Sequence, residues 1–181
     1  AHMSLGAVLI GTGSLYTKLV DRRTTIDPEA FEAAQWMRAY ARERDWAYPD
    51  NYVLSEWGRN RMYNYVVNGQ SESYAYAREY YEAFLFTSDG PGWYEHFEDR
   101  VGFVVTRDFE TIENVHPFRL YARLHYEFGS GTDEAPGVGH YRAVYSSPDG
   151  EYKVFTLVPG ATLTGSLDAT DVRSDVSIDG A

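Results

Sequence analysis

The chain has 181 residues, 27 of them acidic and 16 basic, which gives a net charge of −11. This balance excludes a nucleic-acid-binding protein that works by neutralising phosphates, and an aromatic content of 16% excludes an intrinsically disordered chain. The sequence contains no cysteine, which excludes disulfides, thiolate metal sites and cysteine nucleophiles.

Lysine is rare in this sequence. Only Lys18 and Lys153 are lysines, and the other 14 basic residues are arginines. An acidic excess with so little lysine suits a protein dissolved in concentrated salt, because salt screens the repulsion among the carboxylates. The composition favours a halophilic, archaeal source; an ordinary acidic protein from an arginine-rich genome is the alternative.

The N-terminal residues divide into two parts. Residues 1–3 look like the remnant of a cleaved tag and are set aside. Residues 4–15 are apolar, but a membrane-spanning helix needs about 20 apolar residues. This stretch fits either a buried N-terminal strand or the outer end of a membrane helix.

The first helix is predicted from Asp27 to about Arg44. Asp27 can cap it, Pro28 suits its first position and Glu29 meets the positive end of the helix dipole. A turn at 48–51 then leads to a short strand-like run.

That strand covers residues 52–55. The polar, arginine-rich residues 56–65 come next and are predicted to form a turn. A second helix is predicted over 71–86 and a short third one before Arg100. The apolar run 101–106 predicts a buried strand.

After the strand 101–106, the predicted structure is first helical and becomes β-rich from about residue 140. Pro117 is expected to open another helix, and a glycine-rich loop covers 129–139. Beyond it, polar and apolar residues alternate on both sides of the turn at 148–150, which predicts a hairpin. Two further short strands are predicted near 162–167 and 172–178.

These elements predict an α+β fold. A mostly helical core around one or two short strands is expected at 27–139, and a β-rich C-terminal segment with a hairpin at 140–181. The helix-rich part and the β-rich part are expected to pack on each other.

Residues of known catalytic or metal-binding patterns are scarce. Outside the tag the histidines are His96, His116, His125 and His140, and their spacing matches no metal-binding pattern. The nucleophile elbow of serine hydrolases is also missing from the sequence. We therefore expect no catalytic machinery and no cofactor in this chain.

The residues that most suggest ligand binding follow the first strand, where a carboxylate, an indole and two guanidinium groups gather. Trp57 can stack on a sugar ring or a peptide, and Arg59 and Arg61 can hold a phosphate or carboxylate. The alternative is structural, with an arginine that caps a helix or pairs with Glu56 beside a core tryptophan. The candidate binding residues are Ser55, Glu56, Trp57, Arg59, Asn60 and Arg61.

The order of several segments resembles a known family. An amphipathic helix ends in Trp36-Met37-Arg38, the run 52–55 leads to a Trp-Gly pair, and the strand 100–106 and the Val-Pro-Gly-Ala run within 154–165 follow. Together these segments resemble the extracytoplasmic C-terminal domain of archaeal oligosaccharyltransferase catalytic subunits, over about residues 27–167.

The resemblance implies a soluble part of a membrane glycosyltransferase at the extracytoplasmic face. Such enzymes move an oligosaccharide from a dolichol-type lipid to an asparagine, and their divalent metal and catalytic acids lie in the membrane-embedded part. Residues 4–26 would then be the outer end of a membrane helix with a linker. The implied partners are the membrane-embedded part of the same polypeptide and an acceptor protein or glycan-lipid, with no nucleic acid.

The motif by which the family binds its acceptor is altered. Where the family has Ser-Trp-Trp-Asp-Tyr-Gly-His, this chain matches only at Ser55 and Trp57, and Gly58-Arg59 replaces Asp-Tyr. The replacement makes the site cationic and favours an anionic partner. The altered motif also indicates a divergent haloarchaeal branch of the family, which either handles another acceptor or has lost transfer activity. The competing prediction is a non-catalytic glycan- or protein-binding surface module of a halophilic archaeal membrane protein.

Overall fold

A computed structural model of the chain describes residues 26–109 and 115–160. The tag remnant, almost all of the predicted membrane-helix end and the two strands predicted after residue 161 lie outside these residues.

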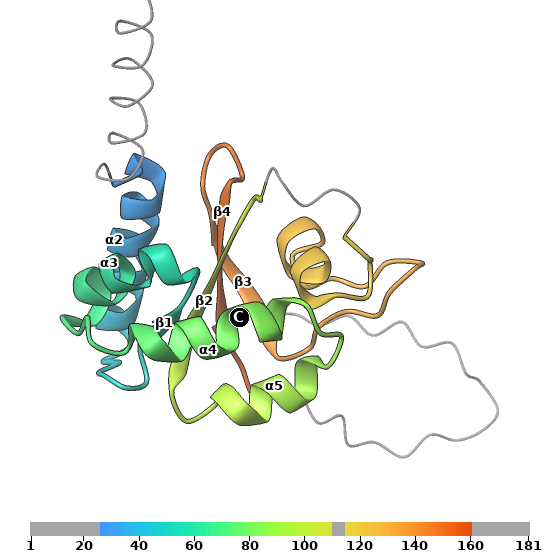
Figure 1. Cartoon of the computed structure of the whole chain (residues 1–181), viewed down its shortest axis with the longest axis horizontal. Coiled ribbons are helices and arrows are strands. Elements are labelled where there is room, and N and C mark those ends of the chain that lie inside the picture. Colours follow the sequence, from blue (N-terminus) through green and yellow to red (C-terminus); the bar gives the residue numbers. More distant parts are fainter. Residues whose placement is uncertain (1–25, 110–114, 161–181) are drawn as a thin grey trace, which may run out of the picture.

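The described part contains a four-stranded mixed sheet flanked by helices, so the predicted α+β class is confirmed (Figure 1). The strands follow the order β1-β2-β4-β3, with β1 and β2 parallel and the other pairs antiparallel. The predicted hairpin is present, and its second strand pairs directly with β2. The strands are β1 (Tyr52–Leu54), β2 (Val101–Arg107), β3 (Tyr141–Ser146) and β4 (Tyr152–Leu157).

Most of the helices agree with the sequence predictions. The first begins as expected, because the Asp27 carboxylate accepts from the backbone N–H groups of Glu29 and Ala30. After Pro117, the predicted helix is only one π-helical turn, η1. The helical elements are α2 (Pro28–Glu43), α3 (Trp57–Asn68), α4 (Tyr74–Leu85), α5 (Gly90–Phe97) and η1 (Ala122–Tyr126).

Helix α3 corrects the prediction of a turn after the first strand. The polar passage is helical from Trp57 onward and ends at Gly69, which takes the left-handed conformation with φ 77°. The apolar pattern is weak because this helix buries asparagines on its inner face, at positions 60 and 64. Amide side chains thus take the place that apolar ones usually hold in a helix that packs on a sheet.

The sheet separates two hydrophobic cores. Consecutive residues of β2 point to opposite faces, so Phe103 and Val105 join one core and Val104 the other. The first core contains side chains of α2 and α3, and the second contains side chains of α4, α5 and η1. A strand buried on both faces explains the unbroken apolar run 101–105.

A glycine allows β1 to reach β2. A Cβ atom on Gly102 would lie only 2.2 Å from the backbone oxygen of Asp50. Since only glycine lacks that atom, the close approach at the start of the β1–β2 pair depends on Gly102.

Candidate functional site

Strand β1 lies at the edge of the sheet, and helix α3 satisfies its free backbone groups with asparagine side chains. The Val53 N–H donates to Asn64 Oδ1 at 2.9 Å, and the Val53 carbonyl accepts from Asn60 Nδ2 at 2.8 Å and Asn64 Nδ2 at 2.9 Å. An edge strand with unpaired N–H and C=O groups is a common aggregation hazard. Here the amides of α3 take the place of a neighbouring strand.

The asparagines also bond to one another along the helix. Asn64 Nδ2 donates to the carbonyl oxygen of Asn60, and Asn68 Nδ2 donates to Asn64 Oδ1 at 3.0 Å and to the backbone oxygen of Asn51. Because residues four apart share a helix face, the three side chains form one row, which we call the asparagine ladder (Asn60, Asn64 and Asn68). The ladder fixes the start of α3 relative to β1.

Two of the predicted binding residues belong to this internal framework. Asn60 and Ser55 are each only 1% exposed, and Asn60 Nδ2 donates to Ser55 Oγ at 3.2 Å. Both side chains are buried at the junction between β1 and α3, so their assignment as ligand-binding residues stays a prediction.

Three of the other predicted residues face solvent to different degrees. Trp57, the first residue of α3, is 52% exposed, and the Arg78 guanidinium lies 5.8 Å from its ring centroid. Arg59 is half-buried, with its guanidinium 5.9 Å from the Tyr152 ring centroid. Arg61 is exposed and lies over the Tyr74 ring, on a different aromatic partner from Arg59.

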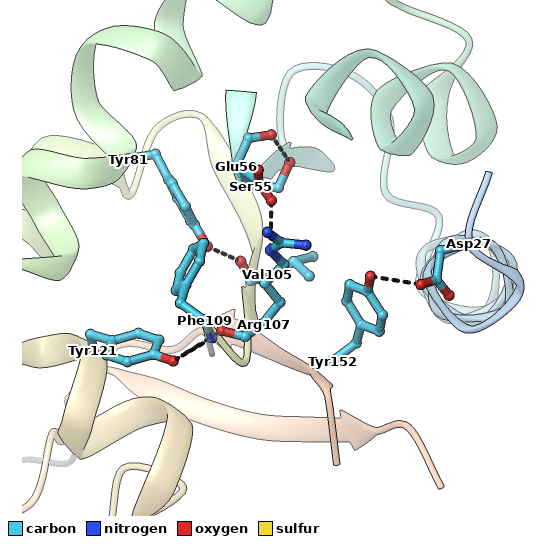
Figure 2. A network of polar contacts seen from close by, with 9 residues as sticks. All are labelled: Asp27, Ser55, Glu56, Tyr81, Val105, Arg107, Phe109, Tyr121 and Tyr152. Atoms are coloured by element: carbon cyan, nitrogen blue, oxygen red, sulfur yellow. Dashed lines mark hydrogen bonds and ion pairs between the residues drawn. The ribbon is translucent and has the colours of Figure 1, made fainter. Parts of the chain in front are cut away.

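Glu56 pairs with an arginine that sequence reasoning missed. Its Oε2 lies 2.8 Å from Nε of Arg107, the last residue of β2 (Figure 2). Since β1 and β2 are parallel, the residues at their carboxyl ends come together at one end of the sheet. The sequence carries no local signal for this contact, because it depends on the pairing of two strands that are far apart in the chain.

A small cavity lies beside the Glu56–Arg107 pair, with room for about one water molecule. Two arginines, Arg59 and Arg107, form part of its wall, together with Tyr63 of α3. The remaining lining residues are Ser55, Glu56, Tyr81, Val105 and Tyr152.

The three tyrosines that line the cavity differ in the hydrogen-bond partners of their hydroxyls. Tyr81 donates to the Val105 carbonyl at 2.8 Å, and Tyr152 lies 3.2 Å from the Asp27 carboxylate (Figure 2). The hydroxyl of Tyr63 is buried, yet it has no hydrogen-bond partner among the residues that the structure describes. Burial raises the pKa of Tyr63, which keeps this hydroxyl a neutral donor.

The histidines in the described part of the chain pack individually. His125 is buried and its Nδ1 lies 2.9 Å from Thr106 Oγ1, while His140 stacks on Tyr94 at 4.2 Å. Within residues 26–109 and 115–160, no group of three or more His, Asp or Glu side chains is placed to hold a metal ion. No helix in those same ranges is long and apolar enough to cross a membrane.

Comparison with known proteins returned no match, either to a family model or to a curated protein. The family resemblance of the sequence therefore stays a prediction.

Proposed function

We propose that this chain is the soluble extracytoplasmic domain of an oligosaccharyltransferase-like membrane glycosyltransferase. In this role it contributes acceptor or glycan binding at the membrane face and does not catalyse transfer alone. The divalent metal and catalytic acids belong to the membrane-embedded part of the same polypeptide. The other partner is an acceptor protein or a lipid-linked glycan.

The observation that carries the proposal is the exposure of Trp57 at the junction of β1 and α3. An indole that is 52% exposed offers an apolar face on which a sugar ring or a peptide can stack. The Arg78 guanidinium lies 5.8 Å from the centroid of its ring, and the preceding residue, Glu56, carries a carboxylate. An apolar face with charged neighbours suits a ligand that combines ring C–H groups with hydroxyls or charges.

The rigidity of the junction also supports a binding role. The asparagine ladder ties the first turns of α3 to β1, so Trp57 projects from a fixed base. A binding group held by packed elements loses less conformational entropy when it binds than one on a free loop.

The competing function is a non-catalytic glycan- or protein-binding module of a halophilic archaeal membrane protein. The exposed indole suits such a module equally well. The two are separated by the gene upstream of this domain. About a dozen predicted spans with acidic residues in the first external loop support the transferase, and a single anchor supports the module.

Calorimetric titration of the purified domain with sequon peptides and with neutral and anionic glycans, in molar salt, tests the proposal. Truncation of a tryptophan at the centre of an interface costs about 2 kcal/mol or more. We therefore expect Trp57→Ala to weaken binding roughly 30-fold, and Arg59→Ala to weaken the anionic ligands most.

Tyr65→Ala is the matched control, because Tyr65 is a 69% exposed aromatic residue farther along the same helix. We expect this variant to bind like the wild type. Binding that is indifferent to both Trp57→Ala and Arg59→Ala would remove the start of α3 as the ligand site.

A further inference from the structure

We propose that the cavity beside Glu56 is an oxyanion site that Glu56 itself occupies in the free protein. The ligand group that replaces it is a carboxylate or a phosphate. The inference rests on the proposed function, because it assigns the anionic end of the ligand whose apolar part stacks on Trp57.

The positive charge of the cavity exceeds its negative charge. Arg59 and Arg107 both line it, whereas Glu56 is the one carboxylate in its wall. The Glu56 carboxylate is paired with Arg107, and in the part of the chain that the structure describes no carboxylate lies within 4.0 Å of the Arg59 guanidinium. Among the described residues, Arg59 therefore has no carboxylate as a counter-charge, and an oxyanion can bind both guanidinium groups through charge-assisted hydrogen bonds.

The Tyr63 hydroxyl is an independent sign that the site is built for a ligand. Tyr63 is 1% exposed and lines the cavity, and its buried hydroxyl has no hydrogen-bond partner across the described ranges. A buried hydroxyl without a hydrogen bond is destabilising, because it has lost its contact with water and has no protein partner in exchange. An oxyanion oxygen, or a water molecule that accompanies it, supplies the acceptor that this donor lacks.

The helix adds two more features that favour an anion. Glu56 is the N-cap residue of α3, and it makes no side-chain bond to the helix backbone. The positive end of the helix dipole thus lies beside the cavity, where it stabilises negative charge. Helix α3 has 12 residues, long enough for this field to develop.

Replacement of Glu56 by a ligand is energetically accessible. The Glu56 side chain is 35% exposed and that of Arg107 is 29% exposed, so the carboxylate can swing into solvent without crossing the core. Partly exposed ion pairs contribute little to stability, and the incoming oxyanion restores the pairing of Arg107. The vacated volume is that of a carboxylate, next to space for about one water molecule.

The test is a titration with inorganic phosphate and with glucuronate at constant ionic strength, followed by amide chemical shifts. Glu56→Gln removes the internal competitor while keeping its shape. We expect this variant to bind at least one of the two probes about tenfold or more tightly than the wild type, with the largest shifts at Gly58 and Arg59. A stronger effect of phosphate indicates a lipid-linked phosphate, and a stronger effect of glucuronate indicates an acidic sugar.

Two double variants control for charge. Glu56→Gln with Arg107→Gln is expected to lose the gain, whereas Glu56→Gln with Arg38→Gln is expected to keep it, because Arg38 is exposed on α2. Equal binding by the wild type and Glu56→Gln, or a gain that survives Arg107→Gln, overturns the oxyanion site. The binding of neutral glycans to the wild type and to Trp57→Ala tests the proposed function without involving the oxyanion site. Failure of the oxyanion site can therefore be distinguished from failure of the proposed function.

Discussion

Two of the polar contacts that attach helical elements to the sheet differ chemically. At β1 the contact is the uncharged asparagine ladder of α3. At β2 and β4 it consists of titratable groups: His125 of η1 bonds to Thr106, and the buried Lys153 donates to the backbone oxygen of His125. Amides keep one protonation state at every ordinary pH, whereas burial and the charge of Lys153 lower the pKa of His125 and so disfavour a protonated imidazole at the η1 contact. The difference indicates that the base of the candidate site is insensitive to pH and that the η1 side is not.

The ladder is most directly broken by Asn64→Ala. This change removes both bonds to Val53 and leaves the buried Val53 N–H without its acceptor. Because a buried group left unsatisfied costs about 1–3 kcal/mol and the second lost hydrogen bond about 1 kcal/mol more, we expect a loss of about 2–4 kcal/mol in the free energy of unfolding. Denaturant unfolding at fixed high salt measures it.

Arg142→Ala on β3 is the matched control at the opposite edge of the sheet. Arg142 is exposed, so the free energy of unfolding should change by no more than about 0.5 kcal/mol. A similar small effect of Asn64→Ala would show that the ladder does not hold the β1 edge.

The η1 contact should respond to acid. Burial, and secondarily Lys153, lower the pKa of His125 from 6.5 to about 4. The folded state then binds this proton more weakly than the unfolded state, so the contribution is complete above pH 6.5 and is lost as the pH falls toward 4. We expect a loss of roughly 2–3 kcal/mol in unfolding free energy over that window, beyond the effect of the carboxylates.

Unfolding curves of His125→Gln isolate this contribution, because glutamine keeps a hydrogen-bonding group near Thr106 but does not titrate. The variant should be less sensitive to pH between 6.5 and 4 than the wild type. His116→Gln, at an exposed position, should retain the wild-type slope. Equal slopes for all three proteins would contradict the assignment to His125.

The smallest effect on stability is expected at the candidate site itself. The Glu56–Arg107 pair is partly exposed, so Glu56→Gln should change the free energy of unfolding by less than about 1 kcal/mol. Thermal and denaturant unfolding measure this directly. A much larger loss would mean that the pair is part of the framework, as the asparagine ladder is, and not a contact that a ligand can replace.

The sequence predicted the elements whose signals are local. Asp27-Pro28 marked the start of α2, the apolar run marked β2, and the alternation around the turn at 148–150 marked the hairpin. Helix α3 was missed because its inner face carries amides, which a search for apolar periodicity does not count. The spacing of Asn60, Asn64 and Asn68 was the available signal.

The candidate site was predicted only in part for a related reason. Trp57 and Glu56 were identified from residue type, but the burial of Asn60 depends on which helix face meets β1. The contribution of Arg107 depends on the parallel pairing of β1 with β2, two strands more than 40 residues apart in the chain. Neither relation is encoded by local spacing, so the three-dimensional arrangement was needed to find them.

The most direct test of the account is chemical-shift mapping of the wild-type domain with glycans and sequon peptides, repeated on Trp57→Ala. The account predicts shifts concentrated on residues 56–59 and on Arg78, and their loss in the variant. Shifts that concentrate on another surface, or that persist unchanged without the indole, would contradict it.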